Sequence, residues 1–330
     1  MRLSSDERRA VVAEASRAPS VHNIQPARWR FEDDSVVLFR ATDRIIPVAD
    51  PSGHDVQASL GAAFEGMALA LSARGLRLGE PQPEADARAT GCAPVVRARI
   101  TQSGDTPPDP LAAFVLRRRA FRGRFGPSRA DDVAVLSALD GADVRLVGAD
   151  ALHALARLHD DATWTYESRP EYHRELWSWL RLSRRHPSYH RDGLNADCLA
   201  LSAPERWAAS SLLQPTRFAW LSRLGIARYL VSESAPVKSA SAALLFCPRR
   251  DAAAFDVGRR FYRLWLEVTA LGFHLTPMSA SADHAPTRAL LESAHRVPSD
   301  RRIANVFRVG RIPDDDVAVS PRLPVDELLV

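Results

Sequence analysis

Two stretches of the chain, GAAFEGMALALSARGLRL from Gly61 to Leu78 and GRRFYRLWLEVTALGFHL from Gly258 to Leu275, decide its fold. They align without a gap, and the identical pairs are Gly61/Gly258, Phe64/Phe261, Leu69/Leu266, Ala73/Ala270, Gly75/Gly272 and Leu78/Leu275. Each stretch predicts a largely buried helix that ends at a glycine in the left-handed conformation and leads into a short strand. The chain therefore contains an internal repeat.

The segments around the two repeated helices also occur in one order. VVLFR at Val36 and AALLFC at Ala242 precede the helix, VVRARI at Val95 and NVFRVGRI at Asn305 follow it, and all four predict strands. SSDERRAVVAEA at Ser4 resembles SRADDVAVLSAL at Ser128, and each reads as a Ser/Asp-capped helix start. Each half therefore predicts an α+β unit, in the order helix, strand, long helix, strand, with a mixed or antiparallel sheet.

The spacing of the repeats predicts the domain organisation. The copies are offset by 197 residues for the long helix and by 124 for the first helix, so the later copy carries about 73 extra residues, near 150–227. The proline-rich TPPDP, 106–110, predicts a linker between an N-terminal half, 1–105, and a C-terminal half, 106–330. A duplicated unit is typical of a fused dimer, in which protomers meet at a self-complementary interface. The alternative is that the halves pack together only for stability.

The amino-acid composition excludes several classes of function. The chain has 330 residues, 46% hydrophobic and 25% charged, which predicts a globular protein with two cores. Its 44 Lys and Arg exceed its 40 Asp and Glu by only 4, which argues against dedicated nucleic-acid binding. The three cysteines are far apart and indicate a reducing compartment. No leader-like or spanning apolar run is visible, so we expect no membrane contact and a cytoplasmic location.

Several common catalytic motifs are missing from the sequence. It contains no G-x-G-x-x-G, G-x-x-x-x-G-K-S/T, G-x-S-x-G or H-E-x-x-H. His186 and His190 have the spacing of helical metal ligands, but Pro187 lies between them and arginines surround them. We therefore expect no metal site.

The first candidate segment is APSVHNIQPARWRF, 18–31, which follows the predicted first helix. Its polar side chains include Ser20, His22, Asn23 and Gln25, and Pro26 follows them. Donors and acceptors on such a turn suit an amide-rich ring or a polyol. The alternative is a capped helix end whose side chains are satisfied internally.

The second candidate segment is LRRRAFRGRF, 116–125. Arg118 and Arg122 are four residues apart and would share a helical face, a spacing that can clamp one phosphate. A solvated cationic face is the alternative. SPRLP, 320–324, adds one more Ser/Arg pair near the C-terminus.

Taken in order, APSxxNxQP, RRxxR, the buried helix that runs into TPMS, and the terminal SPR resemble the nitroreductase family of FMN enzymes, and in particular its fused, Acg-like subgroup. The resemblance spans most of the chain outside the insertion. Nitroreductases are homodimers with FMN at the subunit interface, so the resemblance implies two tandem pseudo-symmetric halves that mimic the homodimer, in a monomer or a weak dimer. Only one complete site can be assembled from these motifs, which implies one FMN per chain.

The resemblance also implies site residues. Arg118, Arg119 and Arg122 match the family's phosphate-binding Arg-Arg-Ser-x-Arg, and Arg322, beside Ser320, matches its C-terminal basic residue. The segment that lies along the flavin corresponds to Pro19, Ser20, Val21, Asn23 and Gln25. The backbone near the reactive N5 edge corresponds to Pro277, Met278 and Ser279. The chain departs from the pattern at Ala120, where the family has Ser or Thr, and at Ala27, where it has Trp.

The insertion is rich in aromatic residues, with Trp164, Tyr166, Tyr172, Trp177, Trp179 and Tyr189 within a short stretch. Arginines between them superficially suit stacking on single-stranded nucleic acid, but interspersed acidic residues spoil such a groove. Packing of an added helical hairpin is one explanation of these aromatics. The functional hypothesis is a lid over the flavin that excludes water and shapes the pocket for a small-molecule substrate.

The function that follows is FMN-dependent oxidoreduction, in which NAD(P)H passes hydride to FMN N5 and the reduced flavin passes electrons to a small nitro, quinone or enone-like acceptor. The cofactor carries this chemistry, which would explain the missing catalytic motifs. One alternative is an FMN-dependent dehydrogenase or oxidase in a biosynthetic pathway. Another is a catalytically silent protein that sequesters flavin.

Overall fold

The computed structural model describes residues 3–313 and 318–330. Each half of the chain builds one antiparallel sheet. The first has the order β1-β2-β5-β3 with β4 beside β5, and the second has the order β6-β9-β11-β10. The strands of the first sheet are β1 (Ala27–Glu32), β2 (Ser35–Ala41), β3 (Leu76–Leu78), β4 (Gln82–Pro83) and β5 (Cys92–Gln102). Those of the second are β6 (Val144–Val147), β9 (Ala242–Phe246), β10 (His274–Pro277) and β11 (Asn305–Gly310). The predicted α+β class is confirmed.

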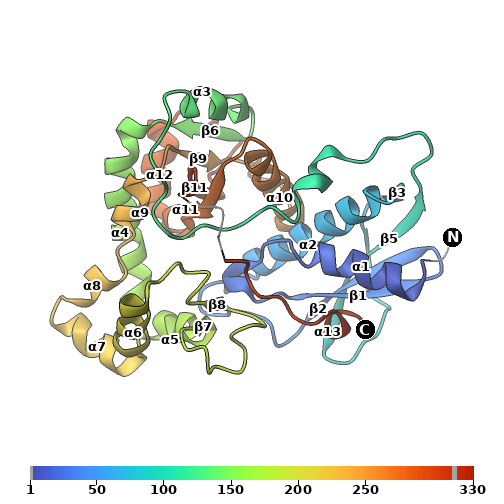
Figure 1. Cartoon of the computed structure of the whole chain (residues 1–330), viewed down its shortest axis with the longest axis horizontal. Helices are drawn as coiled ribbons and strands as arrows, with labels where there is room; N and C mark the ends of the chain where they lie inside the picture. The colour runs from blue at the N-terminus through green and yellow to red at the C-terminus, as the bar shows by residue number, and fades with distance from the viewer. Residues whose placement is uncertain (1–2, 314–317) are drawn as a thin grey trace.

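The two repeated stretches form the long helices α2 (His54–Ser72) and α10 (Ala254–Ala270), which pack against each other. Gly75 and Gly272 follow them with φ of 69° and 80°, a region that side chains disfavour, and β3 and β10 begin just after. Figure 1 shows α2 and α10 side by side where the two halves meet. The predicted helix, glycine stop and strand are therefore present in both copies.

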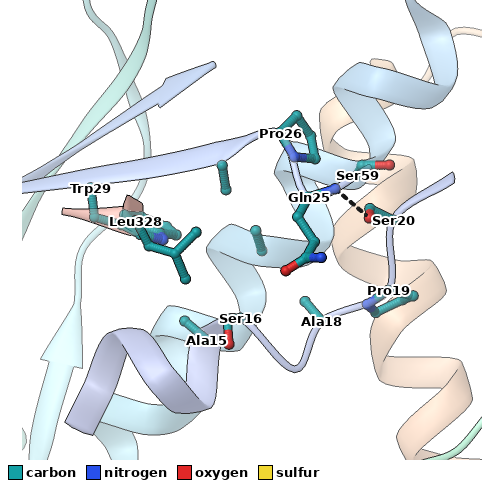
Figure 2. A pocket seen from close by; sticks show the side chains of 12 residues that line it. Ala15, Ser16, Ala18, Pro19, Ser20, Gln25, Pro26, Trp29, Ser59 and Leu328 are labelled. Carbon is teal, nitrogen blue, oxygen red and sulfur yellow. Dashed lines mark hydrogen bonds between the residues drawn. The ribbon is translucent and has the colours of Figure 1, made fainter. Parts of the chain in front are cut away.

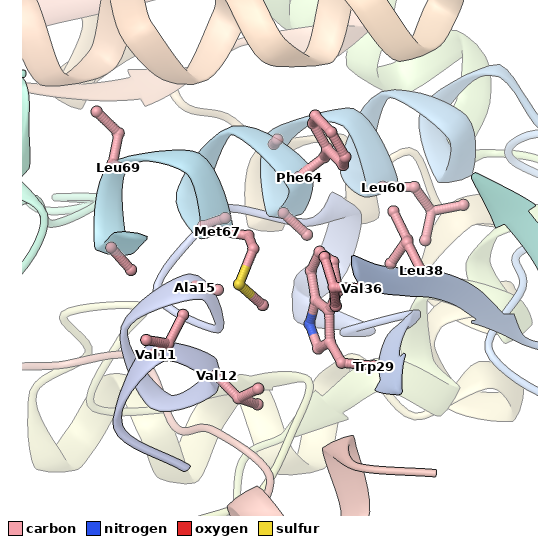
Figure 3. Packing of buried hydrophobic residues seen from close by; sticks show 14 of the residues in the cluster. Val11, Val12, Ala15, Trp29, Val36, Leu38, Leu60, Phe64, Met67 and Leu69 are labelled. Carbon is pink, nitrogen blue, oxygen red and sulfur yellow. The ribbon is translucent and has the colours of Figure 1, made fainter. Parts of the chain in front are cut away.

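Each sheet packs one apolar face on its long helix. In the first half, Val36 and Leu38 of β2 and Trp29 of β1 meet Leu60 and Phe64 of α2, and α1 (Ser5–Ala15) completes the layer (Figure 3). The second sheet does the same with α10 and the short α3 (Asp132–Leu136). Tyr262 and Leu266 of α10 also belong to the first half's core, so the halves share buried surface.

The region predicted as an insertion, 150–227, is only partly peripheral. Its first helix, α4 (Leu152–Glu167), packs Leu152, Leu155 and Ala156 on the other face of the second sheet. The core there is completed by helices outside the predicted insertion, namely α9 (Ser234–Lys238), α11 (Ser279–Asp283) and α12 (Ala285–Ala294). The start of α4 is therefore part of the second half's core, because its apolar side chains cover part of that sheet face.

The rest of the insertion continues as α5 (Pro170–Trp179), the small β7 (Leu180–Arg181) and β8 (Leu194–Asn195) pair, α6 (Ala203–Leu212), α7 (Pro215–Arg223) and then α8 (Ala227–Leu230). Figure 1 shows α6, α7 and α8 together at the end of the molecule farthest from the first half. Among the described residues, no helix is long and apolar enough to cross a bilayer.

The predicted linker has neither helix nor strand at 106–109. A 3₁₀ helix, η2 (Pro110–Phe114), follows, and its Leu111 and Phe114 pack on the first half's core. The chain thus leaves the first half only after this helix, and the short α13 (Val325–Leu328) returns to the first half beside β1.

Candidate functional site

The segment after α1 has an unusual backbone. His22, Asn23 and Gln25 have φ of 44°, 56° and 52°, in the left-handed region. Such conformations in residues other than glycine cost on the order of 1 to 3 kcal/mol each, and they concentrate at functional sites. The Ser20 hydroxyl accepts a hydrogen bond of 3.0 Å from the Gln25 backbone N–H, which holds the turn closed (Figure 2).

This segment is fixed to α2 as well. The Val21 N–H donates to the Ser59 hydroxyl of α2 at 3.1 Å. Pro19 and Ser20 help to line a cavity of about 30 Å³ between the segment, α1 and α2 (Figure 2). Pockets for drug-sized ligands have volumes of roughly 300 to 1,000 Å³, so this cavity alone is far too small for a flavin ring.

The Asn23 and Gln25 side chains join three parts of the chain. The Asn23 amide nitrogen donates to the carbonyl oxygens of Gly193 and Pro321, both at 3.1 Å. The Gln25 amide nitrogen donates to the Arg191 carbonyl at 2.9 Å, and its oxygen accepts from the Leu323 N–H at 2.8 Å. The two amides therefore hold the insertion and the C-terminal segment against the first half.

The arginine segment does not form the predicted helix, and the expectation of a shared helical face for Arg118 and Arg122 is wrong. Ala120 bridges Leu275 in parallel, and the Phe121 N–H donates to the Leu275 carbonyl at 3.4 Å. The main chain is thus bound to the edge of β10, which keeps it extended. Arg118 and Arg122 consequently lie in different surroundings.

Arg118 and Arg322 meet at the carboxyl end of α1. Arg118 donates to the Arg17 carbonyl at 2.8 Å, and Arg322 donates to the same carbonyl at 3.1 Å and to the Asn23 side-chain oxygen at 2.9 Å. The Arg118 guanidinium also lies 4.5 Å from the centroid of the Trp265 ring. The structure thus brings together Arg118, Arg322 and Asn23, three residues from distant parts of the sequence.

This cluster is strongly cationic. It comprises Arg17, Arg118, Arg119 and Arg322, and within the described ranges none of the four forms an ion pair with a carboxylate. Burial, and then the neighbouring arginine charges, lower the pKa of Arg118 to about 10 and that of Arg322 to about 9. Concentrated positive charge of this kind is stabilised by a bound anion.

Arg122 lies near His22, Cys198 and Glu233. Burial lowers its pKa, while Cys198 and Glu233 act in the opposite direction. Its charge, added to burial, lowers the pKa of His22 to about 4. The Cys198 thiol lies next to Ser320 and faces both Arg122 and Arg322, so the two groups of arginines border one region.

Pro277, Met278 and Ser279 lie where β10 ends and α11 begins. Met278 is buried in the second half's core, and its N–H donates to the Val306 carbonyl at 2.7 Å. Ser279 is exposed, and its hydroxyl accepts from the Asn305 side chain at 3.3 Å. Of the three side chains, only those of Pro277 and Ser279 are accessible to solvent.

Two carboxylates, Asp55 of the first half and Asp283 of this stretch, lie close enough for the charge of Asp283 to raise the pKa of Asp55. Burial, and then the charges of Asp283 and Asp50, raise the pKa of Asp55 at the start of α2 to about 7. Burial raises the pKa of Asp283 at the end of α11 to about 6. Ser59, which binds the 19–25 segment, lies one turn along α2 from Asp55. The 19–25 and 277–283 segments therefore border the same stretch of α2.

The aromatic residues of the predicted lid mostly pack between elements. Tyr166 lies 5.5 Å from Tyr172 and 6.4 Å from His284 of the second half, and Trp164 lies 6.5 Å from Phe218, measured between ring centroids. Trp179 packs on the first half's core, and Trp177 is half-buried. The lid hypothesis stays a prediction, but these contacts fit the alternative of packing equally well.

Four further residues of this region were not predicted from the sequence. Two of them stand out in the sequence by their position. Arg17 comes directly before APSVHNIQP, and Arg308 is the one charged residue inside the apolar strand β11. His159 and Glu233 do not stand out, because only the folding of α4 against α9 brings them near Arg308 and Arg122.

Comparison with known proteins gives a consistent set of relatives. A Mycobacterium tuberculosis (strain H37Rv) protein with the provisional name NAD(P)H nitroreductase Rv3131 is 31% identical over 179 residues, 52% of this chain and 50% of that protein. The nitroreductase acg of the same strain, also provisionally named, is 38% identical over 73 residues, 22% of each chain. An uncharacterized protein of that strain, Rv3127, is 27% identical over 96% of this chain and 90% of its own length.

The chain spans about half the length of Rv3131. No family model matches the chain. The crystal structure of a provisionally assigned nitroreductase from Anabaena variabilis superposes with a TM-score of 0.48 at 9% identity, over 94% of this chain and 90% of that one. The predicted resemblance to nitroreductases, Acg included, is confirmed by the sequence relatives.

Proposed function

We propose that this nitroreductase-like chain is an FMN-dependent NAD(P)H oxidoreductase that reduces a small organic acceptor. One observation carries the proposal: a cluster of arginines without carboxylate partners among the described residues, at the junction of the two halves, next to the segment with strained backbone. The names of the sequence relatives support the same activity.

The phosphate end of FMN fits the residues present. Arg118 has a buried Nε atom with no hydrogen-bond partner among the described residues, and Arg17, Arg119 and Arg322 lie in the same cluster. Arginine is the side chain best suited to a phosphate, because its planar group can donate two parallel hydrogen bonds. When bound, FMN would supply the two-electron hydride chemistry that none of the protein's side chains offers.

The protein's own contribution is positioning and exclusion of water. Asn23 and Gln25 hold the 191–193 loop and the C-terminal segment in place, and we assign them this positioning role instead of direct contact with the ring. Three residues remain that could border the flavin. Val21 is hydrogen-bonded to α2, Ser20 is hydrogen-bonded to Gln25, and Ser279 is exposed. If groups from both halves close the site and exclude water, charge interactions inside it become stronger.

Reconstitution with FMN tests the proposal. Purified protein incubated with FMN and desalted should retain flavin absorbance, and Arg118→Ala should retain much less. Arg185→Ala, an exposed arginine of the insertion, is the matched control and should behave as wild type. Protein that takes up no FMN would contradict the proposal.

A catalytically silent flavin-binding protein is a second candidate. The small volume of the cavity beside Pro19 and Ser20, about 30 Å³, favours it, because that cavity alone has no room for the flavin ring. Retained FMN that neither NADH nor NADPH reduces would select this candidate over the reductase.

A further inference from the structure

A larger cavity lies at one end of the first half's sheet. Its volume is about 400 Å³, it opens to solvent, and volumes of this size suit small organic ligands. Gln57 of α2 and Phe255 of α10 line it, together with the end of β2, the start of β5 and Pro83 of β4. Both halves of the chain therefore contribute to its wall.

This cavity lies on the other side of α2 from the 19–25 segment. Ser59 of α2 accepts the hydrogen bond that fixes that segment, and it lines the small cavity described above. Gln57 precedes Ser59 by two residues, which is about 200° around a helix. Among the described residues, none lines both cavities. The larger cavity is thus separate from the region assigned to the flavin.

A β-bulge in β5 shapes one wall of the cavity. In the register of β2 with β5, Leu38 pairs with Val96. The next residue, Phe39, pairs with Pro94, so that Val95 is left as an extra residue. Bulges bend a strand and are over-represented beside functional sites, and they tolerate a proline that cannot donate to the sheet. The bend brings three consecutive apolar residues, 94–96, to the cavity wall.

Two polar side chains at the cavity have no partner within the described ranges. Val36 and Leu38 of β2 pack on α2, and Arg40 follows on the same face of the strand, since side chains alternate. Neither the Arg40 guanidinium nor the Gln57 amide forms a hydrogen bond or an ion pair with a residue that the structure describes. Both residues are half-buried. The planar guanidinium of an unpaired arginine can donate two parallel hydrogen bonds to a carboxylate.

The rest of the wall is apolar. The Phe255 ring lies 5.5 Å from the ring of Phe64, measured between centroids, so the core supports it from behind. Pro83 pairs with Val96 of β5, which fixes the opposite side. Aromatic and proline side chains present flat apolar surfaces, against which an aromatic ring packs well.

We propose that this cavity binds a small aromatic carboxylate, whose carboxylate group pairs with Arg40 and whose ring packs on Phe255 and Pro94. Gln57 donates a further hydrogen bond to the carboxylate. The single arginine favours a carboxylate over a phosphate monoester, because a phosphate carries additional negative charge that one cation does not neutralise. The site is independent of the proposed flavin chemistry.

Calorimetric titration with 2-naphthoate and with its uncharged amide, 2-naphthamide, tests the site. Wild type should bind the acid about tenfold more tightly than the amide, which is the effect of one charge-assisted hydrogen-bonded pair. Arg40→Gln should bring this ratio close to one. Phe255→Leu should weaken both ligands several-fold and leave the ratio unchanged. Arg77→Gln, at an exposed arginine of the same sheet, is the matched control and should keep the wild-type ratio.

If Arg40→Gln does not fold, Arg40→Lys replaces it. This variant keeps the charge but loses the planar group, so it should lower the ratio part of the way. Absence of 2-naphthoate binding to wild type, equal binding of acid and amide, or an equal loss in the Arg40 and Arg77 variants would overturn the site.

The same titrations with added FMN separate this site from the flavin site. Saturating FMN should leave 2-naphthoate binding unchanged, because the two sites lie on different sides of α2. Displacement of 2-naphthoate by FMN would overturn the site. A protein that binds 2-naphthoate through Arg40 but takes up no FMN would contradict the proposed function and uphold the carboxylate site.

Discussion

Gly61 and Gly258 face each other's helices in a reciprocal arrangement. A Cβ atom on Gly61 would lie 1.8 Å from the carbonyl oxygen of Phe255, and one on Gly258 would lie 1.9 Å from that of Ala58. Phe255 and Ala58 each stand three positions before the opposite glycine, so the two contacts are equivalent under the repeat. This is the geometry expected where a self-complementary dimer interface has been joined into one chain.

Substituting either glycine should therefore weaken the contact between the halves. Gly61→Ala and Gly258→Ala each place a methyl group inside a backbone atom's radius, and we expect losses of roughly 1 to 3 kcal/mol or more in the free energy of unfolding. Urea denaturation measures this, with Gly141→Ala as the control, because its Cβ would meet only one atom, at 3.9 Å. Wild-type stability in both helix variants would contradict the reciprocal contact.

The repeat was the most predictive feature of the sequence, because helix, glycine stop and strand are local patterns that recur in register. The sequence predicted only that the 19–25 segment and the C-terminal segment border one ligand. The hydrogen bonds that join Asn23 to Pro321 and Gln25 to Leu323 were not predicted. Their direct contact, and the extended form of the arginine segment, depend on hydrogen bonds between parts distant in sequence, which local periodicity does not encode.

Asp192 should be the most sensitive residue of the loop that covers the first half. Its carboxylate lies 3.0 Å from Arg44 of the first half and 2.9 Å from Arg181 of the insertion, and these side chains are largely buried. Removing one member of a buried ionic group leaves charge uncompensated, at about 3 to 5 kcal/mol. Asp192→Asn should approach that loss in chemical denaturation.

The control for Asp192 is Asp251→Asn, at an exposed pair with Arg249, which should change stability by less than about 1 kcal/mol. Equal effects of the two substitutions would mean that Asp192 does not hold the loop. Amide hydrogen exchange at residues 189–198 should also speed up in Asp192→Asn only.

Asp55 should make the fold less stable as pH rises. Its pKa is raised to about 7 in the fold, compared with about 3.9 in an unfolded chain. Between these values the folded state holds a proton that the unfolded state has released, so the free energy of unfolding falls with increasing pH in this window. Asp55→Asn should therefore gain stability relative to wild type between pH 5 and pH 8.

Asp161→Asn, at an exposed carboxylate, should show no such pH-dependent difference from wild type. The test compares the denaturant midpoints of wild type and of both variants at pH 5 and at pH 8. A difference between wild type and Asp55→Asn that stays constant with pH would rule out a titrating Asp55.

Anaerobic reduction of the FMN-loaded protein tests the central claim most directly. After desalting, one equivalent of NADPH or NADH is added under nitrogen, and the flavin absorbance is followed in a stopped-flow instrument. The flavin bands should bleach and then return when a nitroaromatic or quinone acceptor is added. Bound flavin that stays oxidised with both nicotinamides would contradict a nitroreductase-like oxidoreductase.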